Sequence, residues 1–211
     1  LDSAGSVHFV PTNAPIGQKV SSTGVVSTYS LVYTGSTAYV GGVLASNGDI
    51  HLVPNSAPIG QKISPTGVTS TYSLVYTRSD AYRGGVLSPN GDIHFIPSSG
   101  VVGQKVSKEG VVSTYSLVYT RSSGYVGGVL APNGDIHFVS SIAGKIGQKI
   151  SYSGVVSTYS LNNGGYFGGV LASNGDIHLT QAGWGFGQKI STKPCKPFSK
   201  AMCLSPFLNK F

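Results

Sequence analysis

The feature that most constrains this chain is a repeat of about 43 residues that runs along almost the whole sequence. The histidines are spaced 43, 43, 43 and 41 residues apart. Each stands in a copy of the segment Asp-Ile-His, which is altered to Ser-Val-His in the first copy. A fixed period of roughly 20 to 50 residues indicates a repeat architecture, in which each copy folds as one supersecondary unit. The five histidines are His8, His51, His94, His137 and His178.

One period reads as four short β-strands. The dipeptide Asn47-Gly48 is a strong signal for a two-residue hairpin, because both residues tolerate positive φ. A second turn is expected at Thr66-Gly67, and a Pro-bearing loop separates the two middle strands. The last stretch is rich in Val, Thr and Tyr, which suit a pleated surface. The expected strands of this period are residues 42–45, 49–53, 61–64 and 68–76.

Four antiparallel strands in about 43 residues correspond to one blade of a β-propeller, since propeller blades are four-stranded sheets with periods of roughly 40 to 50 residues. Five periods predict an all-β, five-bladed propeller that occupies residues 1–211 as a single domain. A helical repeat is excluded by composition, because the chain has one Glu and one Met but 31 Ser and 30 Gly. A β-solenoid would use far fewer residues per coil. The expected repeats are residues 1–34, 35–77, 78–120, 121–161 and 162–211.

The repeat resembles the Gly-rich propeller repeats written Gly-Gly-Val-Leu-Ala-Pro-Asn-Gly-Asp-Ile-His-Phe, a string that residues 127–138 carry in full. That resemblance implies the propeller fold and no particular function. In blade number and repeat length the chain is also similar to the five-bladed, tachylectin-2-like propeller lectins. This second likeness implies one sugar site per blade. It assigns no site residues, because the chain carries no residue motif of those lectins and a fold does not imply a function.

Both ends of the sequence depart from the period. The first repeat starts after the point where its Gly-Gly-Val strand is expected, so the first blade should lack its innermost strand. At the other end, residues 201–206 resemble residues 84–89, which form the expected inner strand of another repeat. We expect residues 194–211 to close the ring by supplying the missing strand, because an open ring would leave unpaired strand edges.

The two cysteines, Cys195 and Cys203, are eight residues apart. They are candidates for a small disulfide or for two free buried thiols. A surface rich in Ser, Thr and Tyr favours a secreted or extracellular protein, in which disulfides persist. The sequence has no apolar run of the ~18 residues needed to cross a membrane, so no membrane span is expected.

The polar residues show no recognisable catalytic arrangement. Four of the seven acidic residues belong to Asn-Gly-Asp turns and the others are scattered, so no paired acid and base stands out. Neither a nucleophile elbow nor a phosphate-binding loop occurs in its required strand-to-helix context. In the expected propeller, neighbouring repeat histidines would be roughly 12 Å apart, which is too far to share a zinc ion. The sequence therefore predicts no enzymatic activity, no cofactor and no metal.

Repeating a small cleft around a ring produces avidity from weak sites, so the leading expectation is a multivalent, lectin-like propeller with about one shallow site per blade. A tyrosine precedes each expected inner strand and offers a flat face on which a sugar can stack. The Gln-Lys pair of each repeat supplies further polar contacts. The expected ligand-binding residues are Tyr39, Tyr82, Tyr125, Tyr166, Gln18, Gln61, Gln104, Gln148, Gln188, Lys19, Lys62, Lys105, Lys149 and Lys189.

Each of these residue sets also has a structural interpretation. The tyrosines can fill the seams between blades, the histidines can be buried and satisfied, and the lysines can form a solvated ring. The alternative function is accordingly a structural or protein-interaction propeller without a small-molecule ligand. The expected partners are neutral or acidic glycans, with protein as the alternative, and nucleic acid is disfavoured because the three Arg form no cluster in the sequence. Buried His, Gln and Tyr would favour the scaffold, whereas open clefts would favour the lectin.

Overall fold

The computed structural model describes residues 1–141, 145–181 and 186–192. These residues form 18 β-strands in five antiparallel sheets, which we number 1 to 5 in chain order. Sheet 1 holds β1 (Val7–Phe9), β2 (Ile16–Val20) and β3 (Val26–Ser30). Sheet 2 holds β4 (Tyr39–Leu44), β5 (Ile50–Pro54), β6 (Ile59–Ile63) and β7 (Thr69–Ser73). Sheet 3 holds β8 (Tyr82–Leu87), β9 (Ile93–Pro97), β10 (Val102–Val106) and β11 (Val112–Ser116). Sheet 4 holds β12 (Tyr125–Leu130), β13 (Ile136–Ser140), β14 (Ile146–Ile150) and β15 (Val156–Ser160). Sheet 5 holds β16 (Tyr166–Leu171), β17 (Ile177–Gln181) and β18 (Gln188–Ile190).

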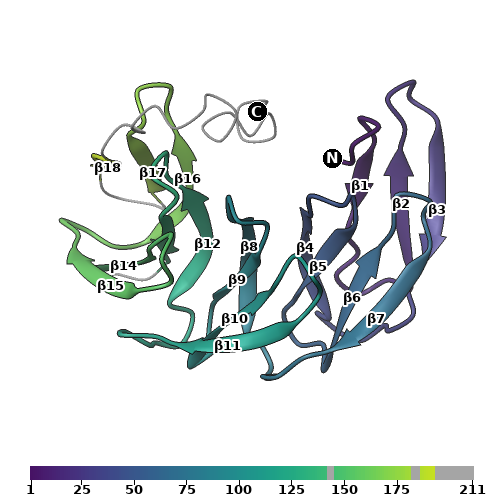
Figure 1. The fold of residues 1–211 in the computed structure, drawn as a ribbon, viewed down its shortest axis with the longest axis horizontal. Helices are drawn as coiled ribbons and strands as arrows, with labels where there is room; N and C mark the ends of the chain where they lie inside the picture. The colour runs from purple at the N-terminus through teal and green to yellow at the C-terminus, as the bar shows by residue number, and fades with distance from the viewer. Residues whose placement is uncertain (142–144, 182–185, 193–211) are drawn as a thin grey trace.

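Each sheet is a simple meander, because its strands pair in chain order. In Figure 1 the sheets follow one another around an arc, with β4, β8, β12 and β16 on the inner side and β7, β11 and β15 on the outer side. The expected all-β design with four-stranded repeats is confirmed by sheets 2, 3 and 4. The outer strand is shorter than the expected 68–76, because the N–H groups of Val75 and Tyr76 bond to the next sheet instead.

The Asn-Gly-Asp segments form hairpins between the first two strands of a repeat, but not through the expected two-residue turn with both residues at positive φ. The Ala45 N–H donates to the Asp49 carbonyl at 2.8 Å across a longer loop, in which only the glycine has a positive φ. Gly48 and Gly91 have φ angles of 88° and 91°, a region that other residues rarely adopt. The Asp49 N–H donates to Asn47 Oδ1 at 3.0 Å, so the asparagine side chain holds the reversal from within. Glycine and asparagine therefore recur at these positions for backbone reasons.

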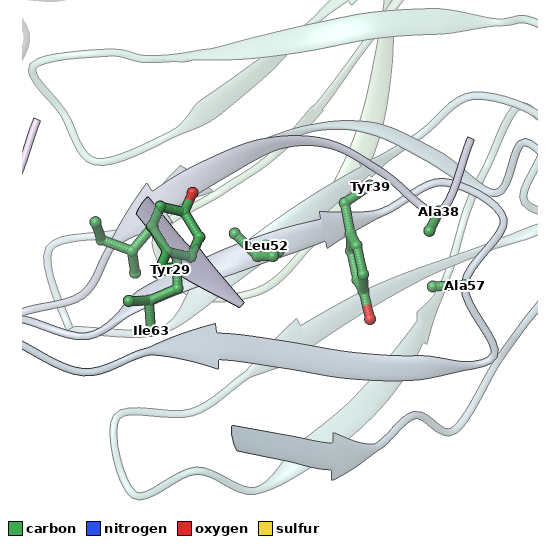
Figure 2. Packing of buried hydrophobic residues seen from close by; sticks show 7 residues of the cluster. Tyr29, Ala38, Tyr39, Leu52, Ala57 and Ile63 are labelled. Carbon is green, nitrogen blue, oxygen red and sulfur yellow. The ribbon is translucent and has the colours of Figure 1, made fainter. Parts of the chain in front are cut away.

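The hydrophobic core lies between neighbouring sheets rather than within one. In the cluster of Figure 2, Tyr29 of sheet 1 packs with Tyr39, Leu52 and Ile63 of sheet 2. Three further clusters join sheets 2 and 3, sheets 3 and 4, and sheets 4 and 5 in the same way. Leu52 and Ile63 are both 0% exposed, and burying each stabilises the fold by about 1.5–3 kcal/mol. Each of the middle sheets thus contributes to two cores.

The glycine of the Gly-Gln-Lys motif makes room for a tyrosine of the outer strand. Gly103 on β10 pairs with Tyr115 on β11, and a Cβ atom added to Gly103 would stand 2.1 Å from the Tyr115 ring. Sheets 1, 2 and 4 repeat this arrangement. The two motifs recur together because one side chain occupies the space that the other residue leaves empty.

Glycine also allows the inner strands to approach one another, as expected. A Cβ atom added to Gly84 on β8 would stand 2.7 Å from the Cα atom of Gly127 on β12. Since the obstacle is backbone, no side-chain movement could relieve this contact. Neighbouring inner strands such as β8 and β12 can therefore lie close together.

Several expectations concern residues outside the described ones. These are the closing segment 194–211 and the disulfide between Cys195 and Cys203. The closed five-bladed ring and the division into five repeats stay predictions. Within the described residues, no helix is long and apolar enough to cross a membrane.

Candidate functional site

In sheets 1 to 4 the repeat histidine packs against a tyrosine of the outer strand of its own sheet. His51 Nδ1 lies 3.2 Å from Tyr72 Oη, and His137 and Tyr159 make the same contact at 3.2 Å. Burial, followed by the charge of a nearby lysine, lowers the pKa of His51, His94 and His137 to about 4. These three side chains are 6% exposed and neutral at pH 7, so they belong to the framework.

The repeat glutamines bind one sheet to the sheet before it. Gln61 Oε1 accepts hydrogen bonds from the backbone N–H groups of Val32 at 2.8 Å and Tyr33 at 2.9 Å, which follow β3. Equivalent bonds of 2.8–3.0 Å join sheet 3 to sheet 2 and sheet 4 to sheet 3. Gln61, Gln104 and Gln148 are fully buried, Gln188 is half-buried, and Gln18 is exposed.

Each repeat lysine is paired with an aspartate of its own sheet, which in four of the five repeats is the aspartate of the Asn-Gly-Asp turn. Lys105 Nζ lies 2.6 Å from Asp92 Oδ2. Burial alone would raise the pKa of Asp92, but the hydrogen bond and charge of Lys105 outweigh it and hold the pKa below its ordinary value. The same pairing joins Lys62 to Asp49 and Lys149 to Asp135 at 2.6 Å, Lys189 to Asp176 at 3.2 Å, and Lys19 to Asp2 at 3.5 Å.

The tyrosines that were expected to form the floor of open clefts are among the most deeply buried side chains. Tyr39 is 0% exposed, and its hydroxyl donates to the Ile59 carbonyl at 2.9 Å. Burial raises its pKa above the ordinary value. A sugar cannot stack on a ring that is enclosed between two sheets. The same holds for the other members of the set, which are 0–2% exposed: Tyr82, Tyr125 and Tyr166.

A cleft between sheets 2 and 3 opens on the face that carries the Asn-Gly turns, which we call the turn face. It has a volume of about 100 Å³ and is lined by Asn47, His51 and Lys62 of sheet 2 and by Lys108 and Glu109 of sheet 3. Small-molecule pockets usually enclose about 300–1,000 Å³. This cleft is well below that range.

The opposite face, which we call the connection face, carries the loops between the second and third strands and the connections from one sheet to the next. Because strands alternate in direction, both kinds of segment meet at the same sheet edge. A belt of backbone hydrogen bonds of 2.7–3.0 Å joins them in alternation. Its N–H to carbonyl bonds run from Asn55 to Ala38, Ala81 to Asn55, Ser98 to Ala81, Gly124 to Ser98 and Ser141 to Gly124.

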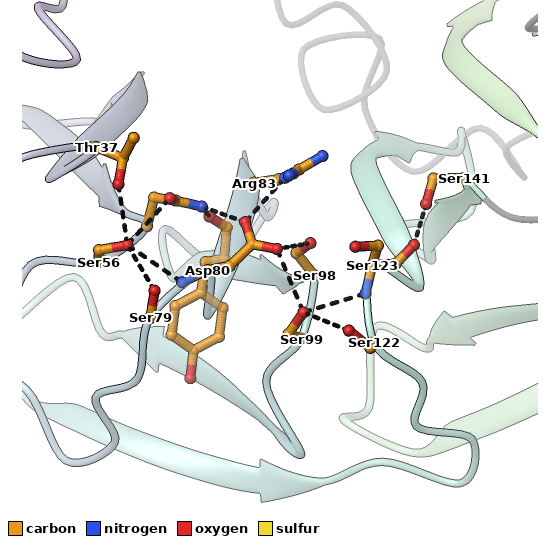
Figure 3. A network of polar contacts seen from close by, with 12 residues as sticks. Thr37, Ser56, Ser79, Asp80, Arg83, Ser98, Ser99, Ser122, Ser123 and Ser141 are labelled. Carbon is orange, nitrogen blue, oxygen red and sulfur yellow. Dashed lines mark hydrogen bonds and ion pairs between the residues drawn. The ribbon is translucent and has the colours of Figure 1, made fainter.

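A second, side-chain network covers this belt. Three residues other than glycine have a positive φ of 51–57° just before an inner strand. This backbone conformation costs about 1–3 kcal/mol for such residues. Each is held by its backbone N–H, which donates to a side-chain oxygen from the preceding sheet at 2.7–3.2 Å. Figure 3 shows the resulting row of hydroxyls. The donor and acceptor pairs are Thr37 with Asn13, Asp80 with Ser56, and Ser123 with Ser99.

Asp80 is the acidic residue of the connection face and the centre of this network (Figure 3). Its Oδ1 accepts from Asn55 Nδ2 at 2.9 Å and from Arg83 Nε at 3.0 Å. Its Oδ2 accepts from the hydroxyls of Ser98 and Ser99 at 3.4 and 3.3 Å. Burial raises the pKa of Asp80, but these hydrogen bonds and the Arg83 charge more than offset it, so the pKa lies below its ordinary value. The carboxylate is ionised and well supplied with donors at neutral pH.

Sequence reasoning missed this cluster, because it counted Asp80 among scattered acids. The signal that could have found it is a double departure from the repeat. Asp80 stands where other copies have Thr37 and Ser123, and three residues later Arg83 replaces an apolar residue. One repeat therefore differs from its neighbours at two positions that contact each other.

Comparison with known proteins gives a fold rather than a family. No model of a known protein family matches the chain, and no curated protein matches it. Solved structures do match. A virginiamycin B lyase from Staphylococcus aureus has 18% sequence identity and a TM-score of 0.76, over 90% of this chain and 67% of that chain. A streptogramin B lyase has 21% identity and a TM-score of 0.74, over 89% of this chain and 65% of that one. An extracellular domain from B. thetaiotaomicron has 10% identity and a TM-score of 0.65, over 86% and 25% of the two chains.

The chain has a β-propeller fold. It spans about two thirds of the length of the lyases it matches. At these identities the likeness concerns the architecture, and the activities of the lyases remain theirs. The matched structures are propellers, but they do not support a specific similarity to tachylectin-2-like propellers.

Two expectations about function are overturned. The lectin prediction is wrong, because the two matched propellers with TM-scores of 0.76 and 0.74 are lyases, and most of the residues assigned to sugar binding are enclosed or ion-paired. Equal repeats had suggested equal clefts, whereas the repeated residues hold the sheets together. The prediction of a non-enzymatic protein is overturned by the same comparison, since it relied on missing motifs and these two matched propellers are enzymes.

Proposed function

We propose that this protein is a protein-interaction scaffold built on a five-bladed β-propeller. The observation that carries the proposal is that the repeated Tyr, Gln and Lys side chains are engaged in packing, inter-sheet hydrogen bonds and ion pairs. The loops of the connection face differ between repeats and include exposed residues, and they are mounted on this rigid framework. Binding residues are concentrated on such loops.

Closure of the ring is part of this proposal and is supported by uneven exposure of equivalent residues. Val43, Val86 and Val129 on inner strands are 4–8% exposed, because the next sheet covers them. Val170 on β16 is 57% exposed, and Phe9 on β1 is 54% exposed. We infer that residues 194–211 supply the inner strand of sheet 1 and cover this apolar surface, which makes residues 1–211 one domain.

An extracellular location completes the proposal. Two of the matched structures are extracellular domains of larger proteins. The abundant surface hydroxyls agree with such a setting.

The proposal can be tested with two serines that are matched in environment. Ser122 lies on the connection face and Ser153 on the turn face, and both are exposed with one hydroxyl contact each, at 3.3 and 2.9 Å. Ser122→Trp and Ser153→Trp each add the same bulk to one face. The set of proteins that cross-link to each of the three chains is compared. Partners that cross-link to the unmodified chain and to Ser153→Trp, but not to Ser122→Trp, would support the scaffold. An identical set of cross-linked proteins for all three chains would refute it.

A lyase-type enzyme is the second candidate, favoured by the matched structures and by one exposed residue. A catalytically inactive variant of the matched S. aureus lyase carries a His-to-Ala substitution. Here His178 on β17 is exposed, unlike His51, His94 and His137. Incubation with quinupristin, followed by mass spectrometry, tests this candidate. A product of quinupristin that is no longer formed by His178→Ala would support it, and unchanged quinupristin after prolonged incubation would exclude this substrate.

A further inference from the structure

The charges of this protein are distributed unevenly between its two faces. The net charge is +7, yet each of the seven acidic residues has a cation within 4 Å. Five of these ion pairs are the Asp–Lys pairs of the repeats. The sixth is Asp80 with Arg83 at 3.0 Å, and the seventh is Glu109 with Lys108 at 3.8 Å. These pairs cancel locally, so the excess charge must come from other cations.

Within the described residues, three Lys and Arg side chains have no acidic partner, and all three lie on the connection face. Arg78 and Arg121 occupy equivalent positions in the connections that follow β7 and β11. Lys145 ends the loop between β13 and β14. All three are exposed. The remaining lysines of the sequence belong to residues 193–211, outside the described part.

The surroundings of these cations favour recognition of carboxylates. The Arg78 guanidinium is held over sheet 3 by a 3.1 Å hydrogen bond from Nη1 to the Ser99 carbonyl, which reduces the entropy lost when it binds. Exposed hydroxyls of Ser79 and Ser122 flank the two arginines in the sequence and can donate further hydrogen bonds. A planar guanidinium matches a carboxylate with two parallel hydrogen bonds.

We propose that the connection face over sheets 2 to 4 binds an acidic segment of a partner protein, through Arg78, Arg121 and Lys145. This inference rests on the proposed scaffold function and names the chemistry of its partner. Three uncompensated charges match a short run of Asp or Glu. Duplex-binding proteins commonly neutralise about 6–10 phosphates, so the described surface is a poorer match for nucleic acid.

The test uses a fluorescent all-glutamate peptide and a single-stranded oligonucleotide of equal charge, with the full chain at low salt. Arg121→Glu and the turn-face control Lys108→Glu change the net charge equally, and both side chains are exposed. We expect Arg121→Glu to weaken peptide binding about tenfold or more, and Lys108→Glu to change it less than about twofold. Added salt should weaken the binding of the peptide.

Three results would overturn the proposal: no peptide binding at low salt, equal loss in both variants, or tighter binding of the oligonucleotide than of the peptide. The scaffold function is judged separately by the Ser122→Trp cross-linking pattern. If that pattern is sensitive to the connection face while the peptide does not bind, the scaffold stands and the acidic partner is wrong. If both measurements fail, both proposals are wrong.

Discussion

Mild acid should unfold this protein, because three buried histidines must take up protons that the fold disfavours. The pKa of His51, His94 and His137 is about 4 in the folded chain, against 6.5 for an exposed histidine. A pKa that is lower in the folded state means that the unfolded chain binds more protons. Stability is therefore complete above pH 6.5 and is lost as the pH falls toward 4.

The size of the loss follows from these pKa values. At about 1.4 kcal/mol per pKa unit, each histidine removes about 3 kcal/mol of stability once the pH is below 4. At pH 5 the loss is about 2 kcal/mol per histidine, and about 6 kcal/mol for all three. Because the free energy of unfolding of an ordinary domain is about 5–15 kcal/mol, we expect the midpoint of acid unfolding near pH 4 to 5. The carboxylates of Asp92 and Asp135, whose pKa values lie below the ordinary value, add to the loss only at lower pH.

Urea unfolding followed by circular dichroism, at several pH values and constant ionic strength, measures this effect. Between pH 6 and 5 the free energy of unfolding should fall by about 3–4 kcal/mol per pH unit. His94→Phe is the informative variant, because His94 Nδ1 has no hydrogen-bond partner among the described residues and the ring packs on Tyr115. It should reduce the slope by about one third, whereas Tyr115→Phe, which keeps every histidine, should leave it unchanged. A free energy of unfolding that is constant from pH 7 to 5 would refute the reasoning.

Three further predictions concern packing, the inter-sheet hydrogen bonds and closure. Gly103→Ala places a Cβ atom 2.1 Å from the Tyr115 ring and should lower the free energy of unfolding by about 1–3 kcal/mol. The control Gly127→Ala, whose Cβ atom would have no neighbour within 4 Å, should change it by less than ~0.5 kcal/mol, and equal effects of the two substitutions in urea unfolding would contradict this prediction. Gln104→Met removes the acceptor of two backbone N–H groups and should destabilise the protein by about 2 kcal/mol or more. Gln18 is exposed, so Gln18→Met is the control, and a similar loss of stability in both variants would contradict this prediction. Deletion of residues 194–211 should expose strand edges and give aggregates in size-exclusion chromatography; a monomer that melts at the parent temperature would argue against closure by this segment.

The period, the turns and the strand order could be predicted from the sequence because they depend on local chemistry. Asn47-Gly48 defines its hairpin without help from the rest of the molecule, and the spacing of the histidines defines the unit that is repeated. The roles of the repeated polar residues could not be predicted in the same way. In most sheets alternation separates a buried face from a wet one, but here neighbouring sheets cover both faces of a middle sheet. Gln61 is consequently 0% exposed, although its neighbours Gly60 and Lys62 do not form an apolar run.

The side-chain network around Asp80 could not be predicted for a different reason. Thr37 and Asp80 adopt a positive φ that local preference assigns to Gly or Asn, because hydrogen bonds from the preceding sheet hold them there. Such a bond joins residues 24 positions apart in both cases, so it is visible only once the sheets are placed. The departure from the repeat at Asp80 and Arg83 can be seen in the sequence. Its meaning becomes clear only from the structure, in which these two side chains contact each other.

The sharing of every described core between two sheets makes this fold a chain of nearest-neighbour couplings. A single repeat excised from the protein would leave both of its apolar faces wet, so it cannot be an independent folding unit. A sheet with two neighbours has twice the coupling of a sheet with one. In an open arc, thermal opening would therefore start at an end and move inward one sheet at a time. A closed ring has no end, so every sheet would have to lose two interfaces before it could leave, and unfolding would change from progressive fraying to a single cooperative step.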